Sequence, residues 1–80
     1  MAKRKPERQV IALDRLPIEL YKLLKYANLA QSGGEAKLLI SEGLVRLNGD
    51  VETRKSKKIA AGDVVGLEGH ELEVVQEVSA

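Results

Sequence analysis

Hydrophobic residues recur with two different spacings along this chain of 80 residues, and the change of spacing predicts alternating helices and strands. Residues 9–13 (QVIAL) form a short apolar run that includes two β-branched side chains, which is typical of a strand. A helical stripe with spacing i, i+3, i+4 and i+7 follows at Leu20, Leu23, Leu24 and Ala27. Pro17 suits the first position of a helix, so we predict a helix over residues 17–27.

A second helix is predicted between a start signal at its N-terminal end and a stop signal at its C-terminal end. Ser32 and Glu35 are three residues apart, as in a capping box, in which both side chains accept hydrogen bonds from backbone N–H groups at the helix start. Gly43 can adopt the left-handed conformation that ends many helices. The apolar stripe between these signals consists of Ala36, Leu39 and Ile40.

Beyond the second helix, apolar and polar residues alternate, as expected for strands with one buried face. Residues 45–47 and 51–53 flank Asn48-Gly49, a dipeptide that favours a two-residue hairpin turn. Two further stretches alternate in the same way, at 64–67 and 72–78. The predicted order is β-α-α-β-β-β-β, an α+β fold in which two helices pack on a small, mainly antiparallel sheet.

Charge is distributed unevenly along the chain although its net value is only +1. All 13 Lys and Arg lie within residues 1–58, together with seven acidic residues, whereas residues 59–80 contain five acidic residues and no Lys or Arg. This asymmetry predicts a basic face that meets a polyanion. We expect residues 1–8 to form a flexible basic arm and residues 9–80 a single domain.

The residue types argue against catalysis, metal binding and membrane insertion. The chain contains no Cys, and its single histidine, His70, lies in a predicted turn without a partner for acid–base chemistry. Asp63 follows Gly62, where a carboxylate commonly caps backbone N–H groups. We therefore predict a non-enzymatic protein that has no cofactor, metal or small-molecule substrate. The lack of Cys and of a long apolar run further favours a cytoplasmic protein that does not enter membranes. We also expect a monomer.

Two segments are candidates for binding phosphate. The run 54–58 carries four positive charges in five residues, at Arg54, Lys55, Lys57 and Lys58. Gly33 and Gly34 open the second helix, where bare N–H groups can approach a phosphate near Lys37; alternatively, the glycines let the preceding loop pack closely. Two tyrosines are the only aromatic residues, too few for a platform that stacks single-stranded bases, so we expect a structured ligand.

Residues 19–67 resemble the S4 (S-four) domain, a small RNA-binding module named after a protein of the bacterial small ribosomal subunit. Its pattern Ser-x-x-x-Ala-x-x-Leu-Ile-x-x-Gly-x-Val-x-Val-Asn-Gly, with a leucine in the first helix before it and Gly-Asp after it, is matched by Leu20, Ser32, Ala36, Leu39, Ile40, Gly43, Val45, Leu47, Asn48, Gly49, Gly62 and Asp63. Within that family the chain resembles the stand-alone bacterial proteins of the YbcJ and YaaA type.

The resemblance implies a fold with an αL motif and a non-catalytic function in binding structured RNA, with ribosomal RNA as the target and ribosome assembly or quality control as the setting. The residues it assigns to RNA binding are Lys25, Ser32, Gly33, Gly34, Lys37, Arg46, Asn48, Arg54, Lys55, Lys57 and Lys58. Asn48 is alternatively explained by its turn alone. Two departures concern these contacts: Gly33 stands where many members have Arg, and Glu19-Leu20-Tyr21 where they have Arg-Leu-Asp.

A second interpretation is a protein-interaction adaptor with a β-grasp-like sheet and an incidental basic loop. In that case the acidic strand at 71–77 would pair with a strand of the partner protein. A carrier protein of this shape would require a flexible Gly-Gly end, whereas this chain ends Val78-Ser79-Ala80. The residues thus favour RNA binding over the adaptor.

Overall fold

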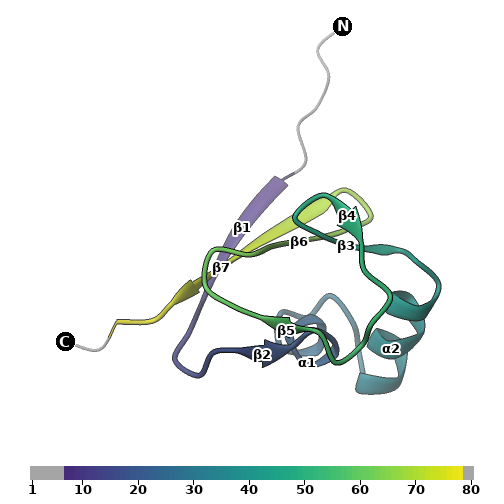
Figure 1. The fold of residues 1–80 in the computed structure, drawn as a ribbon, viewed down its shortest axis with the longest axis horizontal. Helices are drawn as coiled ribbons and strands as arrows, with labels where there is room; N and C mark the ends of the chain where they lie inside the picture. The colour runs from purple at the N-terminus through teal and green to yellow at the C-terminus, as the bar shows by residue number, and fades with distance from the viewer. Residues whose placement is uncertain (1–6, 79–80) are drawn as a thin grey trace, which may run out of the picture.

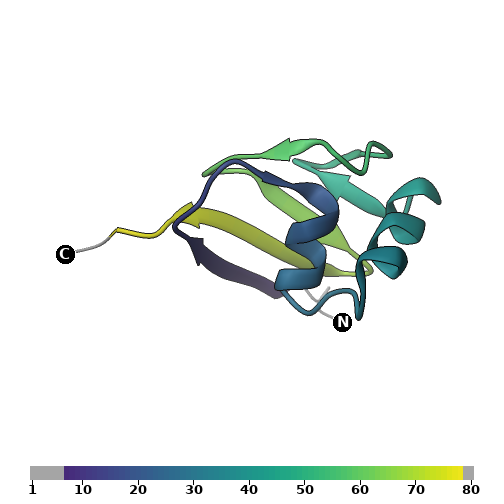
Figure 2. The same cartoon turned by 90° about the horizontal axis from the view of Figure 1, so that it is seen from below.

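Two helices and a pair of very short strands lie on one side of a five-stranded sheet in the computed structural model, which describes residues 7–78 (Figures 1 and 2). The elements in chain order are β1 (Glu7–Leu13), β2 (Ile18–Glu19), α1 (Leu20–Tyr26), α2 (Gly33–Ser41), β3 (Val45–Leu47), β4 (Asp50–Val51), β5 (Lys58–Ile59), β6 (Val64–Leu67) and β7 (His70–Gln76). The predicted arm lies outside the described residues except for positions 7 and 8, which form the start of β1.

The large sheet has the strand order β1-β7-β6-β3-β4, in which every pair except β1–β7 is antiparallel. The predicted class, two helices on a small and mainly antiparallel sheet, is therefore confirmed. The acidic strand β7 has a neighbour on both sides, because β1 and β6 pair with its two edges. It has no free edge for a partner strand, so the pairing expected for an adaptor protein is wrong.

The first helix is shorter than predicted, and its start is wrong by three residues. Ile18 and Glu19 are extended rather than helical, because they pair with β5 in a two-stranded sheet that the sequence pattern did not reveal. The N–H groups of Leu20 and Tyr21 then donate to backbone carbonyl oxygens of residues 57 and 55, at 2.9 and 3.1 Å. First-turn N–H groups lack partners within their helix, so this distant segment, and not Pro17, sets where α1 begins.

The second helix has the predicted bounds and caps. The Ser32 hydroxyl accepts a hydrogen bond from the N–H of Glu35 at 3.1 Å, and the Glu35 carboxylate accepts one from the N–H of Gln31 at 2.6 Å. Gly43 has a φ of +76°, and its N–H donates to the carbonyl of Ile40 as the chain leaves the helix. The signals that predicted α2 are thus all used at its two ends.

The core lies between the helices and one face of the large sheet. Its fully buried large side chains are Leu20, Leu23, Leu24, Ile40, Val45, Ile59, Val65 and Val74. Successive strand residues point to opposite faces of a sheet, so the neighbours of the buried residues point away from the helices. We call this second face the outer sheet face; it includes Arg8, Arg46, Gly66, Glu71 and Glu73.

Candidate nucleic-acid interface

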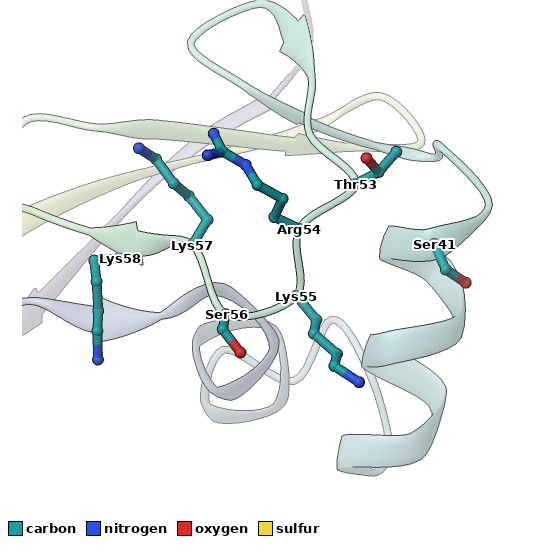
Figure 3. A pocket seen from close by; sticks show the side chains of 7 residues that line it. All are labelled: Ser41, Thr53, Arg54, Lys55, Ser56, Lys57 and Lys58. Atoms are coloured by element: carbon teal, nitrogen blue, oxygen red, sulfur yellow. The ribbon is translucent and has the colours of Figure 1, made fainter.

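The basic run 54–58, which we call the basic loop, connects the hairpin to β5 and passes the N-terminal end of α1. Its backbone is held there because the carbonyls of Lys55 and Lys57 accept the hydrogen bonds from the start of α1. The loop lines a shallow depression together with Ser41 and Thr53 (Figure 3). In this view Arg54 and Lys57 extend to the same side of the loop, and Lys55 extends on the side of α2. Lys58 extends away from Arg54 and Lys57 as well, so the ordered backbone presents cations on both sides of the loop.

One cation of this loop is neutralised within the protein. The Arg54 guanidinium donates two hydrogen bonds to the buried Glu52 carboxylate, at 2.9 and 3.2 Å, and the Arg54 N–H donates a third at 3.0 Å. These hydrogen bonds lower the pKa of Glu52 and raise the pKa of Arg54. Arg54 therefore fixes the beginning of the loop, and the lysines supply its uncompensated charge.

Five lysines form no ion pair with any other residue in the range 7–78, in which the only ion pairs are Arg8–Glu71, Lys22–Glu19 and Arg54–Glu52. These lysines lie on the polar side of α1, in the first turns of α2 and in the basic loop, at Lys25, Lys37, Lys55, Lys57 and Lys58. Lysines that form no ion pair are available to an external anion, and of these five only Lys58 lies directly opposite an acidic residue, Glu19, on a neighbouring strand. Of the eleven residues assigned from sequence, these five form the strongest candidate group.

Tyr21 connects the three segments that carry these lysines. The Lys37 Nζ lies 4.7 Å from the centre of the Tyr21 ring, and the Lys22 Nζ lies 5.9 Å from it, which are cation–π distances. The Tyr21 N–H also donates to the basic loop. We call the area formed by Tyr21, Lys22, Lys25, Tyr26, Gly33, Lys37 and the basic loop the helix-side surface.

Gly33 and Gly34 occupy the first turn of α2, and neither has the positive φ that favours glycine. A Cβ atom added at Gly33 would lie 3.9 Å from the Tyr21 ring, and one added at Gly34 would lie 3.8 Å from the Ser32 hydroxyl. Both are ordinary van der Waals distances, so close packing does not require glycine at either position. The interpretation that the bare N–H groups serve a ligand is therefore the stronger of the two.

Arg46 lies apart from the lysines because it points to the outer sheet face. It is exposed between its register partners Val51 and Gly66, and its guanidinium donates to the carbonyl of Gly49 at 3.3 Å. The structure therefore does not bring Arg46 and Lys37 to the same face of the sheet. Alternation with Val45 and Leu47 already predicted Arg46 on the polar face of the hairpin, but the sequence did not show that Lys37 lies away from that face.

The polar atoms of Asn48 and Ser32 are already used within the fold. Asn48 has a φ of +53°, donates to the Asp63 carboxylate at 3.1 Å and accepts from the N–H of Val64 at 2.9 Å. Asp63 in turn accepts from the N–H of Ala60 at 2.9 Å, as a capping carboxylate does. Asn48 thus ties the hairpin turn to the loop before β6, and the Ser32 hydroxyl caps α2.

Three residues of the helix-side surface were not assigned from sequence: Tyr21, Lys22 and Tyr26. They share α1 with the buried leucines but lie on its other side, and with Lys25 and Gly33 they line one pocket. The available signal in the sequence was that these three residues lie close together within the seven residues of α1. Elsewhere, no cluster of three or more His, Asp or Glu side chains in residues 7–78 could hold a metal ion. The helices in this range are all too short or too polar to cross a membrane.

Comparisons with known proteins find the same domain. The S4 domain family matches residues 11–75. YbcJ of Escherichia coli, described as an RNA-binding protein, is 48% identical over 58 residues, which cover 72% of this chain and 83% of YbcJ. RlbA of Bacillus subtilis, described as a ribosome maturation protein, is 42% identical over 59 residues, 74% of this chain and 83% of RlbA.

Solved structures agree with this fold. The solution structure of Escherichia coli YbcJ, reported to contain an αL motif involved in RNA binding, covers 94% of this chain and 96% of YbcJ, with a TM-score of 0.61 and 39% identity. The 30S ribosomal protein S4e of Thermoplasma acidophilum shares the fold with a TM-score of 0.60 at 22% identity, over 71% of this chain and 30% of S4e. On the family match, the identity to YbcJ and the common fold, the chain belongs to the S4 domain family.

Proposed function

We propose that this protein binds structured RNA through its helix-side surface, without catalysis. The observation that carries the proposal is the group of five lysines, at Lys25, Lys37, Lys55, Lys57 and Lys58, that form no ion pair with the side chains of residues 8–78. Lysines that contact phosphates release the counterions condensed on the RNA, which drives binding without reading the base sequence. The description of YbcJ as an RNA-binding protein, and of its αL motif as involved in RNA binding, supports this proposal.

Ribosomal RNA is the target that we favour within this class. The relative RlbA is described as a ribosome maturation protein, and the fold is shared with a protein of the 30S subunit. A rigid frame of two helices and a hairpin is suited to recognising the backbone shape of a folded RNA. We therefore propose a role in ribosome assembly or quality control, carried out in the cytoplasm by a monomer.

The N-terminal end of α2 supplies a second kind of contact. Gly33 and Gly34 leave their N–H groups uncovered by side chains, and a phosphate placed there would also meet the amine of Lys37, one turn further along the helix. Arg46 and Asn48 contribute less in this arrangement, since one lies on the outer sheet face and the other is hydrogen-bonded within the fold. The lysines of the helix-side surface provide most of the affinity.

The salt dependence of binding to a folded ribosomal RNA fragment tests this proposal. If about four to six phosphates are neutralised, the logarithm of the association constant should fall with the logarithm of salt concentration with a slope of roughly −3 to −5. Substitution of Lys37, Lys55 and Lys57 by Gln should make the slope shallower by about 1 for each phosphate that is no longer neutralised. The absence of binding even at low salt would reject RNA as the ligand. A pull-down of partner proteins that resists RNase would then indicate a protein ligand, bound otherwise than by strand pairing to β7.

A further inference from the structure

Both aromatic residues of this chain line the same surface pocket. The pocket is formed by Tyr21, Lys22, Lys25, Tyr26 and Gly33, and the chain contains no Phe or Trp. Tyr26 is 64% exposed, although large aromatic side chains stabilise a small core strongly when they are buried. The buried core consists of aliphatic residues; Tyr21 packs against it only in part and also lines the pocket, and the exposed Tyr26 is available to a ligand there.

The Tyr21 ring is partly open because its neighbour on α2 has no side chain. Position 33 lies beside this ring, and even a methyl group added there would come within 3.9 Å of it. These are also two of the positions at which the chain departs from the family pattern, with Gly33 in place of Arg and Tyr21 in place of Asp. Gly33 and Tyr21 are neighbours in space. Together they replace two charged side chains of the family pattern with an aromatic ring and with the space that the missing side chain of Gly33 leaves beside it.

The pocket combines aromatic faces with positive charge. Lys22 and Lys25 are part of its lining, and the Lys37 amine lies over the Tyr21 ring at 4.7 Å from its centre. A nucleotide needs both features, since its base stacks on an aromatic ring and its phosphate pairs with an amine. An aliphatic peptide would not require the lysines, and a free phosphate would not require the rings.

We propose that this pocket takes one unpaired base of the bound RNA, which stacks on Tyr21 and Tyr26 while the surrounding lysines hold the adjoining phosphates. The inference rests on the proposed function, because it supplies a specific contact within the RNA-binding surface. It also revises the expectation from composition, since two tyrosines are too few for a platform along a single strand but sufficient for one extruded base. The protein would thus prefer folded RNA that contains a bulged or flipped-out nucleotide.

Three RNA hairpins test this inference with the full chain. The first carries a single bulged adenosine, the second an abasic residue at the same position, and the third is fully paired. The first two have the same number of phosphates, so a difference between their affinities reports the base alone. We expect the bulged hairpin to bind about five- to 150-fold more tightly than the abasic one, as for one stacked base. Its binding should quench the tyrosine fluorescence, which arises from Tyr21 and Tyr26 alone.

Substitutions identify the rings responsible. Tyr26→Ala changes an exposed side chain and should reduce the preference for the bulged hairpin without affecting the fold. Tyr21→Leu should reduce the preference further, whereas Tyr21→Phe retains an aromatic face and should preserve it. Equal affinity of the wild-type protein for the bulged and abasic hairpins, with the expected salt slope, would overturn this inference and leave the proposed function intact. Failure to bind all three hairpins at low salt would overturn both.

Discussion

The helix-side surface and the outer sheet face both contain cations that pair with acidic residues, but the first also carries a group of five lysines that form no ion pair. On the outer sheet face Arg8 pairs with Glu71 at 3.0 Å, and Glu73 lies two residues further along β7. On the helix-side surface five lysines have no ion-pair partner within residues 7–78. The position of acidic residues, more than the number of basic ones, thus decides which face attracts a polyanion.

The two faces differ in whether their charged residues contribute to the stability of the fold. Arg8 and Glu71 are opposite each other on neighbouring strands, where a pair of opposite charge stabilises the sheet. Of the five free lysines, Lys58 lies opposite Glu19 on the neighbouring short strand without forming an ion pair, and the others lie on α1, on α2 and in the basic loop. An exposed lysine that forms no ion pair contributes little to stability, so these lysines can be substituted with little effect on the fold.

The largest expected effect comes from removing the free lysines. Lys37→Gln, Lys55→Gln and Lys57→Gln together should weaken binding to folded RNA by about 100-fold or more at 0.1 M salt, since each phosphate left without its lysine costs about tenfold there. Electrophoretic mobility shift or fluorescence anisotropy measures the affinity, and thermal unfolding should show an unchanged fold. The matched control, Arg8→Gln with Arg46→Gln on the outer sheet face, should change affinity by less than about tenfold. Equal losses in both variants would show that the division into two faces is wrong.

The second effect concerns Asn48, whose substitution distinguishes a structural role from a role in RNA binding. Asn48→Ala should lower the free energy of unfolding by about 2 kcal/mol, because it loses two hydrogen bonds and disfavours the positive φ of +53°. Urea denaturation measures this change. Asn48→Gly, which keeps the turn conformation, should lose less stability. If the folded variants also lose most of their RNA affinity, Asn48 contacts RNA directly and the structural explanation is insufficient.

The third effect is a pH dependence that originates at Glu52. Glu52→Gln should lower the free energy of unfolding by about 1 kcal/mol at pH 7, because the Arg54 hydrogen bonds lose their charged acceptor. The pKa of Glu52 is lowered in the folded state, so its contribution is complete above its ordinary value of 4.5 and disappears as pH falls through the folded value. The difference between the wild-type protein and the variant, measured by urea denaturation, should therefore shrink below pH 4.5. A difference that stays constant to pH 2 would contradict this assignment.

The smallest expected effect on stability is that of Gly33→Ala. A Cβ atom fits there at 3.9 Å from the Tyr21 ring, and alanine is the better helix former, so the free energy of unfolding should rise by up to about 1 kcal/mol. RNA affinity should nevertheless decrease, because the methyl group covers the N–H groups and the edge of the pocket. Gly62→Ala is the control, since its φ of +95° makes any side chain destabilising. A marked loss of stability in Gly33→Ala would show instead that packing requires this glycine.

Features defined by local contacts were predicted correctly from sequence, namely the bounds of α2 and the turn of the hairpin, although the strand that follows this turn is Asp50–Val51 and not 51–53. Ser32, Glu35 and Gly43 determine α2 through hydrogen bonds within a few residues, and Asn48-Gly49 determines the hairpin in the same way. The start of α1 was predicted wrongly because its first N–H groups bind carbonyls more than 30 residues further along the chain. The same reason hid β2 and β5, whose two-residue lengths give no pattern of their own.

The amino-acid sequence alone established the fold class, the family resemblance, the capped second helix and the presence of a concentrated basic run. Which cations act together depended on the tertiary structure: it neutralised Arg54 with Glu52, turned Arg46 to the outer sheet face and placed Lys37 over Tyr21. Helix caps and turns depend on residues that are neighbours in the chain, so they can be recognised directly in the amino-acid sequence. A binding surface depends on residues from separate elements that share one face, and that arrangement exists only once the sheet has formed and the helices have packed on it.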